Sequence, residues 1–116
     1  MKPPIIVIDG ETVDLFPSVM AAERYLEAPD IEGLSIFDAD GYRLRADAVE
    51  ENVSVAGPWT TARSRVSIRM PEPPLRDQDA LRLLLQNHLR ATGHRAGDLD
   101  ETDIVAEAVR LLGFTE

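Results

Sequence analysis

Alternating apolar and polar residues mark much of the first 70 positions of the chain as β-strands. Residues 5–8 form a β-branched run that predicts a buried strand. Asp9-Gly10 follows, a dipeptide typical of tight hairpins, and the alternation over residues 12–16 predicts the returning strand. The sequence therefore indicates an N-terminal β-hairpin.

Residues 18–28 are expected to form the first helix. Ser18 offers a side-chain oxygen as the N-cap acceptor. Val19, Ala22 and Leu26 then recur at helical spacing and supply one apolar stripe. Pro29 ends the helix, because proline cannot continue the hydrogen-bond ladder.

The stretch SIFDADGYRLR, residues 35–45, admits two interpretations. A calcium loop with Gly41 at its sixth position would place Asp40 and Asp38 at the fifth and third, but Ile36 at the first, where a ligand is required. The flanking residues also alternate as strands rather than as helices. We therefore predict a hairpin turn with glycine in the left-handed conformation.

The clearest alternation runs from residue 63 to 70, and Val53 and Val55 extend the preceding strand to a break at Gly57-Pro58. If Val66 and Ile68 point into the core, then Arg63, Arg65 and Arg69 project from the other face. The preceding strand repeats this arrangement, with Leu44 inward and two arginines outward. The outward arginines of the two strands are Arg43, Arg45, Arg63, Arg65 and Arg69.

Two helices are expected after a proline-rich connector. Asp77 caps the first, which ends at Gly93, and Asp100 caps the second, which ends at Gly113. Their apolar stripes consist of Leu81, Leu84, Leu85 and Leu89, and of Val105, Ala108, Val109 and Leu112.

These elements predict an α+β fold with a mainly antiparallel sheet of four or five strands in the order ββαββ(β)αα. One crossover helix and two C-terminal helices packed on one face complete it. We expect residues 1–116 to form a single compact domain: residues 1–70 are the sheet with helix 18–28, residues 71–76 the proline-rich connector, and residues 77–113 the two-helix segment. Alternatively, the connector makes the helical pair a semi-independent arm.

Composition narrows the function classes. The chain has no cysteine, so it forms no disulfide and offers no thiol nucleophile. No apolar run approaches the length of a signal or membrane segment, and we expect a cytoplasmic protein. The net charge of −9 opposes binding to nucleic-acid phosphates. Eleven of the twelve basic residues are arginine, which is typical of a GC-rich bacterial genome.

Motifs for catalysis, metal or cofactor binding are lacking. His88 and His94 are six residues apart across a helix end and do not form an i, i+4 metal pair. No nucleophile elbow and no phosphate-binding glycine pattern occurs. We expect no catalytic residue, no metal and no cofactor; the enzyme alternative is a metal-independent pocket with carboxylates and His88.

The outward arginines are the main candidate site. They fit three interpretations: a solvated face with cross-strand partners such as Asp47, a protein interface, or a nucleic-acid platform, which the net charge and the scarcity of aromatic residues oppose. Together with Trp59, an anchor typical of binding hot spots, they predict a small non-enzymatic module that binds a protein partner or a second copy of itself.

An acidic cluster offers a second interaction surface. Its residues are Asp98, Asp100, Glu101 and Asp103. We interpret them first as an N-cap with first-turn acids, which the helix dipole favours. The alternative is an immunity-type protein that neutralises a basic toxin nuclease through this surface.

Overall fold

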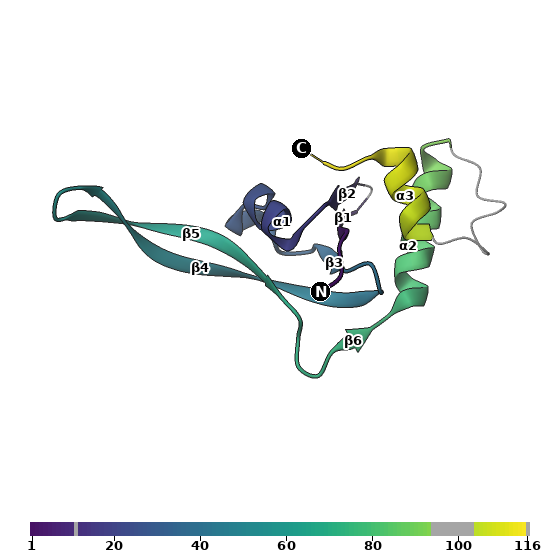
Figure 1. The fold of residues 1–116 in the computed structure, drawn as a ribbon, viewed down its shortest axis with the longest axis horizontal. Helices are drawn as coiled ribbons and strands as arrows, with labels where there is room; N and C mark the ends of the chain where they lie inside the picture. Colours follow the sequence, from purple (N-terminus) through teal and green to yellow (C-terminus); the bar gives the residue numbers. More distant parts are fainter. Residues whose placement is uncertain (11, 94–103, 116) are drawn as a thin grey trace.

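The computed structural model describes residues 1–10, 12–93 and 104–115. The predicted α+β order is confirmed (Figure 1). Along the chain the elements are β1 (Ile5–Asp9), β2 (Thr12–Phe16), α1 (Val19–Tyr25), the 3₁₀ turn η1 (Ala28–Asp30), β3 (Ser35–Phe37), β4 (Tyr42–Ala56), β5 (Trp59–Arg69), β6 (Leu75–Arg76), α2 (Gln78–Ala91) and α3 (Ile104–Leu112).

All strand pairs are antiparallel, in the order β2-β1-β3-β4-β5, and β6 pairs with the start of β4. The sequence predicts four or five strands, and the five of this order are present. The strand that the sequence did not predict is β6, inside the proline-rich connector. It has only two residues, Leu75 and Arg76, which is too short for alternation to mark it.

Helices cover both faces of the central sheet. Alternate residues of β1 enter two separate cores, so residues 5–8 are all buried, as their β-branched run predicted. Ile5 and Val7 pack with Ala22 of α1, whereas Ile6 and Ile8 pack with α2 and α3. The two C-terminal helices therefore lie on one face, as expected, and α1 lies on the other.

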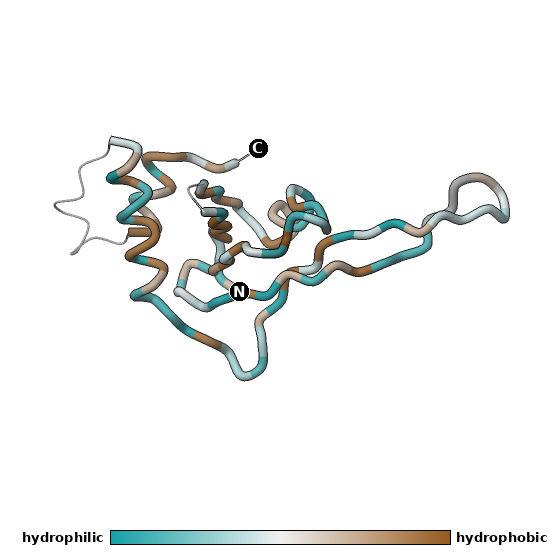
Figure 2. The backbone as a smooth tube through the Cα atoms, turned by 180° about the vertical axis from the view of Figure 1, so that it is seen from behind, coloured by the Kyte–Doolittle hydropathy of each residue, from teal (hydrophilic) through white to brown (hydrophobic). Residues whose placement is uncertain are grey.

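The hairpin of β4 and β5 projects far beyond this body (Figure 1). It gives the protein extents of 60 × 31 × 21 Å, an elongated outline that the sequence did not indicate. Val66 and Ile68 of β5 are buried in the body, but β5 from Trp59 to Arg65 is exposed. We call residues 49–65, the outer part of this hairpin, the ribbon. Figure 2 colours most of it teal to pale, while brown segments gather in the body.

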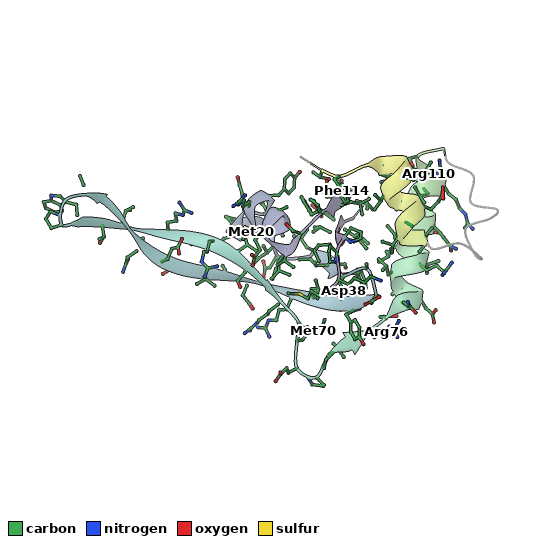
Figure 3. All side chains as sticks on the ribbon, viewed as in Figure 1. Met20, Asp38, Met70, Arg76, Arg110 and Phe114 are labelled. Atoms are coloured by element: carbon green, nitrogen blue, oxygen red, sulfur yellow. The ribbon has the colours of Figure 1, made fainter. Side chains whose placement is uncertain are left out.

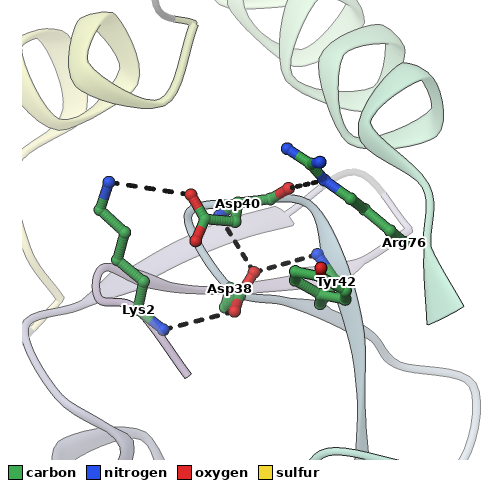
Figure 4. A network of polar contacts seen from close by, with 5 residues as sticks. All are labelled: Lys2, Asp38, Asp40, Tyr42 and Arg76. Carbon is green, nitrogen blue, oxygen red and sulfur yellow. Dashed lines mark hydrogen bonds and ion pairs between the residues drawn. The ribbon is translucent and has the colours of Figure 1, made fainter. Parts of the chain in front are cut away.

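The Asp-Ala-Asp-Gly segment is the turn of a hairpin, as predicted, because β3 and β4 pair on either side of it. The Asp38 carboxylate is 2% exposed and accepts three backbone N–H groups. They belong to Asp40 and Tyr42, both at 3.0 Å, and to Lys2 at 3.3 Å (Figure 4). Asp38 thus holds its own turn together and ties it to the N-terminal segment.

The same turn joins the start of α2 to the sheet. Asp77 donates its backbone N–H to the carbonyl oxygen of Gly41 at 2.8 Å, and Arg76 donates Nε to the carbonyl oxygen of Asp40 at 3.0 Å. Gly41 has a φ of +85°, and a Cβ there would lie 2.6 Å from Cγ of Gln78. Glycine is therefore required both by the backbone conformation and by the close approach of α2.

The predicted helix caps are confirmed where the structure describes them. Ser18 accepts the N–H of Ala21, and Asp77 accepts the N–H of Ala80. Gly93 and Gly113, which follow α2 and α3, both have positive φ. The predicted cap at Asp100 lies outside the described residues.

Candidate functional site

The orientation of the β5 side chains is the one predicted from alternation. Val66 and Ile68 enter the core next to α1. Because side chains alternate along a strand, the odd-numbered residues of β5 point to the opposite face of the sheet. The side chains of Arg65 and Arg69 are 48% and 62% exposed, and that of Arg63 is exposed as well. In Figure 3 the side chains drawn on the outer part of the β4–β5 hairpin stand away from the body.

Strand register gathers four arginines on one face of the hairpin. Arg45 lies opposite Arg69, and Glu51 lies opposite Arg63. We define the arginine face as these side chains and their neighbours of the same parity: Arg45, Asp47, Glu51, Arg63, Arg65 and Arg69. Its four guanidinium groups face two carboxylates.

Each carboxylate of the arginine face is shared by two arginines. Asp47 lies 3.1 Å from Nε of Arg45 and 2.9 Å from Nε of Arg69. Although Oδ2 of Asp47 is shielded from solvent, its contact with Arg69 lacks hydrogen-bond geometry and is an ion pair only.

Glu51 bridges the other two arginines, at 3.7 Å from Arg63 and 3.4 Å from Arg65. Exposed pairs of this kind contribute about 0–1 kcal/mol each, so they orient the guanidinium groups more than they stabilise the fold. The cross-strand partners expected for a solvated face are therefore present, yet they leave two positive charges uncompensated.

This positive excess contrasts with the rest of the chain. Residues 42–69 hold five arginines and three acids and have a net charge of +2. Because the whole chain has a net charge of −9, all other residues together have a net charge of −11. This excess lies on the inner part of the hairpin, on Arg43, Arg45 and Arg69 against Asp47, whereas the ribbon itself, with Arg63 and Arg65 against Glu50 and Glu51, has no net charge. Charges segregated in this way favour association with acidic surfaces.

Arg43 lies on the same side of β4 as Arg45, as the sequence predicts, and its side chain is 43% exposed, but it contacts the body. Its guanidinium group lies 5.1 Å from the centre of the Phe37 ring and 3.4 Å from Oδ2 of Asp77. These contacts tie Arg43 to the body near the start of α2. The sequence could not distinguish it, because alternation reports the face of a strand and not how far the covering helices extend along it.

Trp59 lies at the tip of the ribbon, directly after the Gly57-Pro58 turn, and is 74% exposed. It pairs with Ala56 across the end of the hairpin, next to a register shift between Ser54 and Ala56. The predicted strand began at Arg63, but pairing with β4 continues outward to Trp59. An exposed tryptophan on a projecting tip offers a large rigid apolar surface for contact with another molecule.

Among the described residues, nothing pairs with the outer edge of β5 over most of its length. Within the described part of the chain, β5 is the last strand of the sheet and pairs only with β4. Its inner end is closed by α1, where Glu23 accepts the N–H of Ile68 at 2.8 Å. A groove of about 420 Å³ lies beside this closure, between α1 and β5, and is lined by Met20, Glu23, Arg24, Leu26, Arg63, Ser64, Arg65 and Val66.

Another groove, lined by acidic residues, lies elsewhere on the body. It has a volume of about 700 Å³, and Tyr25 lies on its wall. Five carboxylates line it: Asp9, Asp14, Glu27, Asp30 and Glu32. His88, which the enzyme alternative places among carboxylates, is partly buried on α2 and does not line this groove. The enzyme alternative stays a prediction.

Other features add no site among the described residues. Within residues 1–10, 12–93 and 104–115, no three acidic or histidine side chains gather in a way that could hold a metal ion. The helices described there are all too short or too polar to cross a membrane. The acidic cluster Asp98, Asp100, Glu101 and Asp103, together with His94, lies outside these ranges. No protein-family model, no curated protein and no solved structure matches the chain.

Proposed function

We propose that this protein is a non-enzymatic interaction module that binds another protein, or a second copy of itself, through the arginine face and Trp59. The observation that supports this most is the ribbon that projects from an acidic body and exposes Trp59, Arg63 and Arg65. We place the protein in the bacterial cytoplasm on the sequence grounds given above.

The exposed arginines and tryptophan of the ribbon favour a protein surface as the partner. Arginine and tryptophan are the residues most enriched at interface hot spots, because they combine a large contact area with directional donors. The guanidinium groups are already oriented by Asp47 and Glu51, so little side-chain entropy is lost when a partner carboxylate joins them.

Nucleic acid fits the ribbon less well. Trp59 is the only aromatic residue between positions 43 and 69, so the arginine face lacks the successive stacking surfaces of single-strand binders. The ribbon also has no net charge, because Glu50 and Glu51 balance Arg63 and Arg65, so it offers few phosphate contacts against the repulsion from a body with net charge −9.

Affinity capture with matched variants tests this proposal. The full chain is immobilised, and the proteins it retains from a bacterial lysate are compared for wild type and a ribbon variant, Trp59→Ala with Arg63→Ala and Arg65→Ala. The matched control removes one exposed apolar side chain and two exposed arginines from the helices: Leu83→Ala, Arg90→Ala and Arg110→Ala. Like Arg63, Arg110 has a carboxylate partner, here Glu107.

The proposal predicts that the ribbon variant loses a retained protein, or loses self-association, at least about tenfold relative to the control, as expected when hot-spot side chains are truncated. Both variants should keep the circular dichroism spectrum and unfolding midpoint of wild type. Equal retention by the ribbon variant and the control would refute it.

A further inference from the structure

The ribbon lacks the cover that a two-stranded sheet normally needs. From Trp59 to Arg65 every residue of β5 is exposed, although the ladder with β4 continues to the tip. An isolated two-stranded hairpin is only marginally stable in water, and each added strand stabilises it. The ribbon therefore has a structural reason to gain another strand.

The free edge of β5 presents a regular row of backbone groups. The N–H of Ile68 points out of the sheet, since it donates to Glu23 of α1 rather than to β4. Backbone N–H groups alternate between the two sides of a strand, so those of Thr60, Ala62 and Ser64 also point outward. These three residues form an unpaired edge just beyond the point where α1 closes β5.

We propose that this edge pairs with the same edge of a second copy, antiparallel and about a twofold axis through Ala62. The inference rests on the proposed function and names its partner and geometry. Thr60 of each copy then lies opposite Ser64 of the other, and Ala62 lies opposite Ala62. Each of these pairs exchanges two N–H···O bonds, which gives about six new hydrogen bonds.

The side chains of the arginine face select this register. With the axis at Ala62, Arg65 lies opposite Trp59 and Arg63 lies opposite Thr61, so two arginine–tryptophan pairs form in each dimer. With the axis at Ser64, Arg63 would lie directly opposite Arg65, which is unfavourable because like charges then face each other.

The ends of the ladder fit the surrounding structure. Pro58 of one copy reaches the position opposite Val66 of the other, where its missing N–H ends the ladder. One step further in, α1 occupies the edge at Ile68. The segment of the second copy from Pro58 to Thr61 runs along the 420 Å³ groove between α1 and β5, which stays open for it.

The outer edge of β4 is the competing surface, and it fits less well. β3 already pairs with β4 up to Leu44. A second ribbon could therefore pair with the outer edge of β4 without meeting β3 only if the twofold axis lay near Asn52. In that register the irregularity between Ser54 and Ala56 interrupts the ladder, and no arginine–tryptophan pair forms.

Cysteine cross-linking tests the register, because the natural chain contains no cysteine. Three single variants, Thr60→Cys, Ala62→Cys and Ser64→Cys, are oxidised under identical conditions. In the proposed dimer the two copies of residue 62 face each other at about 5.5 Å between Cα atoms, a separation that a disulfide spans. Residue 60 lies about 14 Å along the strands from its own copy, but opposite residue 64.

The expected result is that Ala62→Cys forms a covalent dimer at least about tenfold faster than either other variant, because only its sulfur atoms are within reach. A mixture of Thr60→Cys and Ser64→Cys should give the mixed dimer at a comparable rate. Equal rates for the three single variants, or fastest cross-linking at residue 64, would overturn the proposed register.

Sedimentation equilibrium of the full chain supplies an independent test. Ala62→Pro removes an outward N–H without removing a bond to β4, and Asn52→Pro makes the matched change on the opposite edge, since Asn52 pairs with Ala62. We expect wild type and Asn52→Pro to dimerise and Ala62→Pro to sediment as a monomer. Dimers of Ala62→Pro, or a monomeric wild type at all concentrations, would overturn the inference.

The two proposals can fail separately. If wild type is monomeric but the capture experiment still depends on Arg63, Arg65 and Trp59, self-pairing is wrong and the interaction module stands. If wild type is monomeric and the ribbon variant retains the same proteins as the helix control in the capture experiment, both proposals are wrong. A circular dichroism spectrum of Ala62→Pro equal to that of wild type shows that the variant folds. The cross-linking result with the cysteine variants does not depend on the folding of Ala62→Pro.

Discussion

Replacement of Asp38 should destabilise the fold more than any charge on the arginine face. Asp38 is 2% exposed, and its carboxylate accepts the N–H groups of Lys2, Asp40 and Tyr42. Asp38→Ala removes all three acceptors at once. Asp38→Asn keeps one carbonyl oxygen for Asp40 and Tyr42 but removes the negative charge.

The magnitude follows from the hydrogen bonds. A buried N–H without an acceptor costs about 1–3 kcal/mol, and water can reach part of this turn because the Asp40 side chain is 44% exposed. We therefore expect Asp38→Ala to lower the free energy of unfolding by about 2–4 kcal/mol. Asp38→Asn should cost about 0.5–1.5 kcal/mol, since Oδ1 can be replaced by the amide oxygen.

Urea unfolding followed by circular dichroism measures both changes as shifts of the midpoint at constant slope. A loss below about 0.5 kcal/mol for alanine, or equal losses for alanine and asparagine, would show that the acceptor oxygens do not hold the turn. Added Ca²⁺ should leave the wild-type midpoint unchanged, because backbone donors already occupy both carboxylate oxygens. Stabilisation by Ca²⁺ would favour the calcium loop that we rejected.

Five further substitutions test how the ribbon and the turn are joined to the body, each by urea unfolding. Gly41→Ala should cost about 2–4 kcal/mol, and Gly33→Ala only about 1, because both have positive φ but only residue 41 meets α2. Glu23→Ala should cost about 1–2 kcal/mol by leaving a β5 amide without its acceptor. Val66→Ala should cost about 2 kcal/mol, whereas Arg65→Ala should stay within about 0.5.

For each of these substitutions, the opposite result would contradict a specific contact or face assignment in the structure. Equal costs at the two glycines would mean that α2 does not approach the turn. A neutral Glu23→Ala would mean that α1 does not close the edge of β5. A larger loss for Arg65→Ala than for Val66→Ala would reverse the assignment of the β5 faces.

Much of the fold could be predicted from the sequence, because its local signals agree. The buried strand β1, the two helix caps at Ser18 and Asp77 and the hairpin turn at Gly41 all follow from residue types whose physical roles are specific. The alternation of Val66 and Ile68 with arginines was enough to predict which face of β5 enters the core.

The reach of the ribbon could not be predicted. Apolar residues such as Leu44 and Val66 alternate with polar ones both where a strand lies on the core and where it continues beyond it. The sequence therefore could not show that Arg43 contacts the body whereas Arg65 lies on the ribbon. The segment Trp59–Ala62 carries no apolar alternation at all, and it is a strand only because β4 pairs with it. Tertiary context, and not local preference, decides both.

The fluorescence of Trp59 is the most direct test of the ribbon as an interaction surface, because it is the only tryptophan and reports from the tip alone. Its quenching by acrylamide is measured as protein concentration rises, and again with any captured partner. We predict a fall in quenching and a shift of emission to shorter wavelength in at least one of these titrations. Emission and quenching that stay constant throughout both would contradict the account.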